Sequence, residues 1–259
     1  MNIIIFSKDR ACQLDLLIRS IKQLWNGWDQ FHFNILWTVS CDFFKTGYTQ
    51  VMADHPEMFF RYQEDFKKDL CLLFNPKKKY SMFFVDDQVM KEPFDMSCLE
   101  VEDFKTNENI MALSLRLYPG ITYCHPRSMN VSVPKFTRNY LWRWEEYQGD
   151  WSYPFSVDSN IMRTEDIINP IFSRPYTNPN NFEDALVQGM THRPFMTCFE
   201  KSKVVNNPCN KVGFYNNRHG SVTAESLNDM YLAGKRINLG PILNMNPVSC
   251  HQEFDYLWL

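Results

Sequence analysis

Two adjacent carboxylates follow an apolar stretch of the chain and are its strongest candidates for chemistry. Asp86 and Asp87 come directly after Phe83, Phe84 and Val85, which predict a buried strand. Adjacent carboxylates repel each other unless a cation offsets their charge. A hard divalent cation such as Mg²⁺ or Mn²⁺, held also by phosphate oxygens, is the usual partner. A solvated acidic turn is the alternative, but a position after an apolar strand favours the metal site.

A second group of polar residues follows the first apolar stretch of the chain. It consists of Ser7, Lys8, Asp9 and Arg10, and Gln13 comes three residues later. A strand, a polar loop and an amphipathic helix in this order present backbone N–H groups and side chains to a nucleotide. The loop contains neither Gly-x-Gly-x-x-Gly nor Gly-x-x-x-x-Gly-Lys, so neither a dinucleotide-binding fold nor a P-loop is supported. The alternative to nucleotide binding is that these are ordinary surface residues.

The spacing of apolar residues predicts an α/β fold that positions both groups. Short apolar runs alternate with amphipathic stretches, which implies a central, mostly parallel sheet flanked by helices. The strands are predicted at residues 3–6, 32–39, 58–62, 80–85 and 111–117, and the helices at 14–24, 48–55, 66–73, 182 onwards and 224–232. Asn180 or Asn181 is expected to cap the helix that starts near Phe182.

Size and composition indicate one globular domain over residues 1–259. Of the 259 residues, 44% are hydrophobic and 22% are charged, and no repeat or linker divides them. A net charge of −3 argues against a protein that binds nucleic acid through a basic surface. No apolar run approaches the roughly 20 residues of a membrane span. Peripheral contact with a membrane stays possible, since Lys77, Lys78 and Lys79 could attract anionic lipid headgroups or anionic donors.

The cysteines and the aromatic residues limit the class of protein further. Eight cysteines are scattered without a Cys-x-x-Cys pair, which predicts mostly buried free thiols in a reducing cytoplasm and argues against zinc. The apolar opening of the chain is expected to be a strand rather than a signal peptide.

Aromatic residues gather at positions 142–155, including Trp151 and Phe155. They either pack in the core or form a wall on which an acceptor sugar stacks.

Several segments together resemble the GT-A-fold glycosyltransferases, which use nucleotide-sugar donors. The resemblance runs in chain order through residues 4–21, 83–87, 113–117, 153–161 and 178–184, and so covers nearly the whole chain. It implies a GT-A-like single domain, with a nucleotide-sugar-binding part at residues 1–120 and an acceptor-facing part at residues 121–259. The family's metal motif is usually Asp-x-Asp, whereas Val85 precedes the acidic pair here.

The resemblance assigns roles to the acidic pair and to the first loop. It favours Asp87 as the direct ligand of the divalent metal, with Asp86 nearer the ribose or the waters of the metal. His251 near the C-terminus is a candidate for an additional metal ligand, although a surface histidine is the commoner case. The loop residues are expected to bind the nucleotide diphosphate part of the donor, and they are Ser7, Lys8, Asp9, Arg10 and Gln13.

Four further residues are candidates for the sugar-transfer step. Glu183 or Asp184 matches the position of the family's acidic base, although acids also favour the first turn of a helix for electrostatic reasons. Asp158 resembles the loop that contacts the donor or acceptor sugar, with a simple turn residue as the alternative. Arg116 lies in an apolar run and either pairs with an acid of the donor site or extends to the surface.

The expected function is therefore a metal-dependent transfer of sugar from a nucleotide diphosphate to a saccharide or other hydroxyl acceptor. Inversion is favoured because an acid occupies the base position. One alternative is a sugar-nucleotide nucleotidyltransferase, but the glycine-rich phosphate loop normal near its start is absent. The other is a non-catalytic carbohydrate-binding or scaffold protein on the same fold. The presence of two acidic pairs, Asp86-Asp87 and Glu183-Asp184, argues against a non-catalytic protein.

Overall fold

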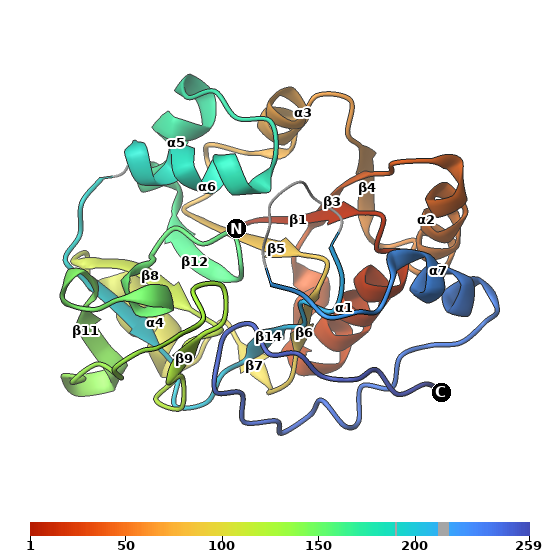
Figure 1. Cartoon of the computed structure of the whole chain (residues 1–259). Coiled ribbons are helices and arrows are strands. Elements are labelled where there is room, and N and C mark those ends of the chain that lie inside the picture. The colour runs from red at the N-terminus through yellow and green to blue at the C-terminus, as the bar shows by residue number, and fades with distance from the viewer. Residues whose placement is uncertain (190, 212–217) are drawn as a thin grey trace.

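A sheet of eight strands forms the centre of the molecule (Figure 1). The computed structural model describes residues 1–189, 191–211 and 218–259. In order across the sheet, the strands are β11 (Leu141–Arg143), β13 (Phe195–Cys198), β8 (Ile110–Ser114), β12 (Asn160–Arg163), β5 (Tyr80–Val85), β1 (Asn2–Lys8), β3 (Phe33–Thr38) and β4 (Phe59–Tyr62).

Parallel pairing dominates the half of the sheet that comes first in the chain. Strand β1 pairs in parallel with both β3 and β5, and β3 pairs in parallel with β4. Strands β8 and β13 form another parallel pair, whereas β12 runs antiparallel between β5 and β8, and β11 runs antiparallel beside β13. The predicted α/β class, with a mostly parallel sheet flanked by helices, is confirmed. Because β1 and β5 are parallel neighbours, the loops that follow them leave from the same edge.

Helices cover both faces of the sheet, as Figure 1 shows. Alternate residues of β1 point to opposite faces, so that Ile3 and Ile5 belong to one hydrophobic cluster and Ile4 and Phe6 to the other. The first cluster is closed by α1 (Ala11–Leu24), α2 (Asp42–Asp54), α4 (Leu99–Thr106) and α7 (Ala224–Leu232). The second is closed by α3 (Phe66–Leu73), α5 (Thr164–Ser173) and α6 (Pro179–Gln188).

Short strand pairs outside the main sheet bring distant parts of the chain together. They are formed by β2 (Trp25–Asn26) with β7 (Phe94–Asp95), β6 (Gln88–Met90) with β14 (Val204–Asn206), and β9 (Tyr123–Cys124) with β10 (Met129–Asn130). The antiparallel pairing of β6 with β14 sets Asn206 opposite Gln88. This pairing places a late segment of the chain beside the acidic pair that follows β5.

Three predicted elements have the predicted ends, namely α3, β5 and α7. The start of α6 was predicted at the wrong residue. Asn178, and neither Asn180 nor Asn181, caps this helix, because its side chain accepts from the backbone N–H of Asn181 at 3.1 Å. The Asn181 side chain accepts in return from the N–H of Asn178 at 3.0 Å, and Pro179 takes the first helical position.

The strand predicted over residues 111–117 is shorter and ends at Ser114. Beyond it, the backbone of Leu115 leaves the ladder and bonds to Ser159 and to residues 203 and 204. The Ser114 hydroxyl accepts from the backbone N–H of Arg116 at 3.3 Å. Arg116 therefore lies in a turn after the strand, where its buried side chain faces the site.

The aromatic stretch belongs to the core. Trp151 and Phe155 are fully buried. The Trp142 indole donates to the backbone oxygen of Trp151 at 2.9 Å, and the Trp151 indole donates to that of Ile121 at 3.1 Å. The idea that an acceptor sugar stacks on Trp151 or Phe155 is therefore wrong, because packing takes both ring faces. Tyr153, between them, is half-buried.

All eight cysteines are free, and five of them are buried, as their scattered spacing predicted. Among the helices described in the structure, none combines the length and apolar character needed to cross a membrane.

Candidate functional site

The loops after β1 and β5 meet at one edge of the sheet, as their order in the sheet requires. Asp86 lies there with its side chain buried. Its Oδ2 accepts from the Ser7 hydroxyl at 3.0 Å and from the backbone N–H of Lys8 at 2.9 Å. The Ser7 hydroxyl also lies 2.5 Å from the Tyr48 hydroxyl. The polar group at the end of β1 and the one that follows β5 therefore contact each other directly.

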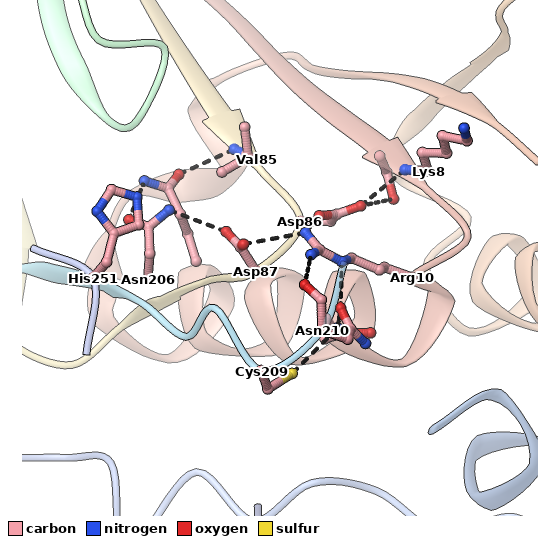
Figure 2. A network of polar contacts seen from close by, with 12 residues as sticks. Lys8, Arg10, Val85, Asp86, Asp87, Asn206, Cys209, Asn210 and His251 are labelled. Carbon is pink, nitrogen blue, oxygen red and sulfur yellow. Dashed lines mark hydrogen bonds and ion pairs between the residues drawn. The ribbon is translucent and has the colours of Figure 1, made fainter. Parts of the chain in front are cut away.

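Arg10 supplies a positive charge to both members of the acidic pair (Figure 2). Its Nη1 lies 3.0 Å from Asp86 Oδ1 and 3.1 Å from Asp87 Oδ2. The other side of the guanidinium is held by Asn210, whose side-chain and backbone oxygens accept from Nε and Nη2, both at 2.7 Å. A positive charge from the chain itself therefore lies beside the pair, where the sequence analysis expected a divalent metal ion.

Burial and charge set the protonation of Asp86 and Arg10. Burial, together with the charge of Asp87, raises the pKa of Asp86 to about 6, although Arg10 acts in the opposite direction. Burial opposes the charge on Arg10, but the two carboxylates outweigh it and raise the pKa of the guanidinium above its ordinary value. Arg10 thus stays charged at every physiological pH.

Gln13, near the start of α1, and Asp9, in the first loop, also have structural partners. The Gln13 amide donates to Asn210 Oδ1 at 3.2 Å and so supports the residue that holds the Arg10 guanidinium. Asp9 adopts φ of 57°, an unusual conformation for a non-glycine residue. Its carboxylate accepts from the N–H of Ser40 at 2.7 Å and fastens this loop to the one after β3.

Arg116 and Asp158 form a second buried ion pair in the site. Arg116 Nη1 lies 2.9 Å from Asp158 Oδ2, and its Nη2 donates to the Ser156 hydroxyl at 2.8 Å. Burial opposes the charge on Asp158, but Arg116 and His251 outweigh it and hold the pKa of Asp158 well below its ordinary value. The imidazole Nε2 of His251 lies 3.6 Å from Asp158 Oδ2. Arg116 therefore pairs with an acid, as expected for a charge in an apolar run.

Glu183 lies just after the first turn of α6 and projects towards this second ion pair. Its Oε1 accepts from the backbone N–H of Val157 at 2.7 Å, and its Oε2 accepts from the Tyr153 hydroxyl at 3.3 Å. Burial and the nearby charge of Asp158 raise the pKa of Glu183 to about 8. Asp184 is exposed. The two acids of this pair therefore differ sharply in environment, and only Glu183 has that of a tuned proton acceptor.

Asn206, at the end of β14, joins the two charged groups and is a residue that the sequence analysis missed. Its amide nitrogen donates to Asp87 Oδ1 at 3.0 Å, and its amide oxygen accepts from Arg116 Nη1 at 3.2 Å. Nothing in the local sequence around Asn206 distinguishes it from a turn residue. Only the pairing of β14 with β6 brings it to the acidic pair.

The acidic pair offers the oxygen donors that a hard divalent cation prefers. Among the described residues, no three His, Cys, Asp or Glu side chains are grouped so as to hold a metal ion by themselves. Mg²⁺ characteristically uses only one or two carboxylates and completes its shell with phosphate oxygens and water. Asp86 and Asp87 fit this mode, and Arg10 already neutralises part of their charge. His251 is grouped with Asp158 rather than in a three-ligand cluster.

Comparison with known proteins gives one match in sequence. No family model matches the chain. The chain is 31% identical over 215 residues to the bifunctional glycosyltransferase pgtA of Dictyostelium discoideum. The match covers 71% of this chain and 27% of that protein, so the chain spans about a quarter of the length of its relative.

Two solved structures resemble the fold distantly. One is the mannosyltransferase PcManGT from Pyrobaculum calidifontis in complex with GDP-Man and Mn²⁺, at 8% identity and a TM-score of 0.41, covering 76% of this chain and 54% of that chain. The other is the apo structure of the bifunctional glycosyltransferase WbbM, at 12% identity and a TM-score of 0.34. This match covers 74% of this chain and 35% of that chain. The match in sequence supports the resemblance to glycosyltransferases stated above: most of this chain is similar to a part of a bifunctional glycosyltransferase.

Proposed function

We propose that this chain transfers a sugar from a nucleotide diphosphate donor to a hydroxyl group of a saccharide or other acceptor, with the help of a divalent cation. One observation carries the proposal. A continuous series of contacts runs from Arg10 and the acidic pair through Asn206 to Arg116 and Asp158, and Glu183 lies next to that ion pair. Under this proposal, the groups that bind the donor and the group that accepts the proton lie at one edge of the sheet.

The donor side of the site is built from the loops after β1 and β5. We assign Ser7, Lys8, Asp9 and Arg10 to the nucleotide diphosphate, with Gln13 holding Arg10 through Asn210. Asp87, supported by Asp86, is the proposed ligand of Mn²⁺ or Mg²⁺, and His251 is a candidate for a further ligand. When bound, such a cation offsets the negative charge that develops on the leaving diphosphate. Arg10 and Arg116 contribute positive charge from the chain itself.

The acceptor side is centred on Glu183. A carboxylate with a pKa of about 8 can take a proton from an acceptor hydroxyl near neutral pH. The Tyr153 hydroxyl and the Val157 N–H each hold one of its oxygens, which limits the directions in which it can accept. A base at this position would assist direct attack on the anomeric carbon, so the proposed reaction inverts its configuration. Residues 1–120 would bind the nucleotide sugar and residues 121–259 would face the acceptor.

A binding measurement followed by product analysis tests the proposal. Titration calorimetry with UDP and GDP, each with and without Mn²⁺, should give binding that the cation strengthens at least about tenfold. The corresponding nucleotide sugars should then yield a glycoside whose anomeric configuration, read by NMR, is opposite to that of the donor. Binding of free sugars without any nucleotide would instead identify a carbohydrate-binding protein.

A further inference from the structure

Asn206 connects the two charged groups of the site but has no role of its own in the proposed transfer. Its side chain is 1% exposed and lies beside Asp87 in Figure 2. Its two amide atoms contact opposite sides of the site, with Asp87 on one side and Arg116 on the other. Displacing a buried amide that bonds to charged partners at both ends would destabilise the site, because losing a hydrogen bond to a charged group costs more free energy than losing one to a neutral group.

The contacts permit only one orientation of this amide. The Arg116 guanidinium can only donate, so the atom 3.2 Å from its Nη1 is the amide oxygen. A carboxylate oxygen accepts, so the atom 3.0 Å from Asp87 Oδ1 is the amide nitrogen. Gln88 Nε2 also donates to the amide oxygen at 3.2 Å. Its own orientation is fixed because its Oε1 accepts from the N–H of Val85 at 3.1 Å.

This orientation has two consequences for Asp87. The positive charge of Arg116 polarises the amide in the direction that strengthens its donation to the carboxylate. Asn206 and Arg10 also hold different oxygens of Asp87, since Asn206 donates to Oδ1 and Arg10 to Oδ2. Donors from β14 and from the loop after β1 therefore fix the plane of this carboxylate together.

We propose that Asn206 is a positioning residue of the transfer site. It holds the Asp87 carboxylate in the plane needed to receive the diphosphate donor and its cation, and it ties that carboxylate to the Arg116–Asp158 pair. The inference rests on the function proposed above. It adds that Asn206 acts through Asp87, so its contribution to donor binding should depend on the presence of that carboxylate.

A double-mutant cycle tests this dependence. Binding of MnCl₂ with UDP or GDP, whichever the wild-type chain prefers, is measured for Asn206→Leu, Asp87→Ala and the double variant. Asn207→Leu is the matched control, because Asn207 is an adjacent buried asparagine whose side chain bonds to the backbone of Phe254. If Asn206→Leu does not fold, Asn206→Ala replaces it with Asn207→Ala as its control.

We expect Asn206→Leu to weaken binding about tenfold or more, the usual effect of losing a hydrogen bond to a charged group. In the Asp87→Ala background the same substitution should weaken binding by less than about twofold. An equal loss in both backgrounds, or an equal loss in Asn207→Leu, would overturn the inference and leave the proposed function standing. A wild-type chain that binds neither nucleotide with the cation would overturn the proposed function and this inference together.

Discussion

Arg10 places a guanidinium nitrogen 3.0 Å from the Asp86 carboxylate, so the acidic pair has a cationic partner before any ligand arrives. The same nitrogen lies 3.1 Å from Asp87. Two carboxylates and one guanidinium leave the triad with about one negative charge, which is less than a divalent cation needs for tight binding on its own. The phosphates of the donor would supply the missing charge, and so we expect the cation and the nucleotide to bind together.

Arg10→Met tests this account of the charges. Removing the guanidinium leaves two adjacent carboxylates without their internal cation, and affinity for Mn²⁺ in the absence of nucleotide should rise by about tenfold or more. Electron paramagnetic resonance of free Mn²⁺ in a titration measures it directly. Arg19→Met is the control, because Arg19 lies on α1, the helix that follows Arg10, but pairs with Asp15 instead. Equal Mn²⁺ affinities in the wild-type chain and Arg10→Met would contradict the role given to Arg10.

Asp87→Asn should abolish most sugar transfer while leaving the fold intact. Asparagine keeps the size of the side chain, and Arg10 still has Asp86 and Asn210 as partners. Loss of the carboxylate charge should lower turnover by about 10²-fold or more, as is usual when a group that stabilises developing charge is removed. Nucleotide release at saturating donor and metal measures turnover, and thermal melting checks the fold. Turnover close to that of the wild type would show that Asp87 is not the metal ligand.

Glu183→Gln should lower kcat by about 10² to 10⁴-fold and leave donor affinity almost unchanged. The amide keeps the size of the carboxylate but cannot take the proton of the acceptor. Asp184→Asn is the matched comparison, since Asp184 is the next residue of α6 and is exposed. Initial rates at saturating donor should be close to wild type for Asp184→Asn. The opposite pattern would move the base by one residue, and two active variants would place it elsewhere.

The sequence predicts the part of the site that depends on strand order. Asp86 and Ser7 both follow apolar strands, and parallel neighbours in a sheet release their loops at the same edge, so their contact could be expected. Glu183 was predicted from its place in a helix that resembles those of a known family, and the structure adds its hydrogen bonds to Val157 and Tyr153. Both predictions use information that lies within a few residues of the site.

The rest of the site depends on contacts between distant segments, which local patterns do not encode. Asn206 reaches Asp87 only through the pairing of β14 with β6. Arg10 was expected to face a donor, and its fourfold contact with the acidic pair and Asn210 could not be read from a polar loop. Trp151 lies in a stretch compatible with either a core or a sugar site, and only its packing decides for the core.

The raised pKa of Glu183 predicts how activity depends on pH. A base must be deprotonated to act, and with a pKa of about 8 most of the carboxyl groups are protonated at neutral pH. We therefore expect kcat/KM to rise roughly tenfold per unit below about pH 8 and to level off above it. Initial rates between pH 6 and 9.5 measure this profile. In Glu183→Gln the rise attributed to this group should disappear, and a wild-type profile that is flat over this range would contradict the assignment.

The same pKa predicts an effect on stability with a definite sign. Because the pKa is higher in the folded chain than in the unfolded chain, the folded state binds more protons between the ordinary carboxyl pKa and about 8. The contribution of Glu183 to the free energy of unfolding is therefore fully present at low pH and is lost as the pH rises through about 8. Glu183→Gln removes this titration, so it should gain stability relative to the wild type between pH 5.5 and pH 9. Urea unfolding of both proteins at the two pH values measures the difference. If the free energy of unfolding of Glu183→Gln minus that of the wild type stays constant or falls between pH 5.5 and pH 9, Glu183 is not an acid with a raised pKa.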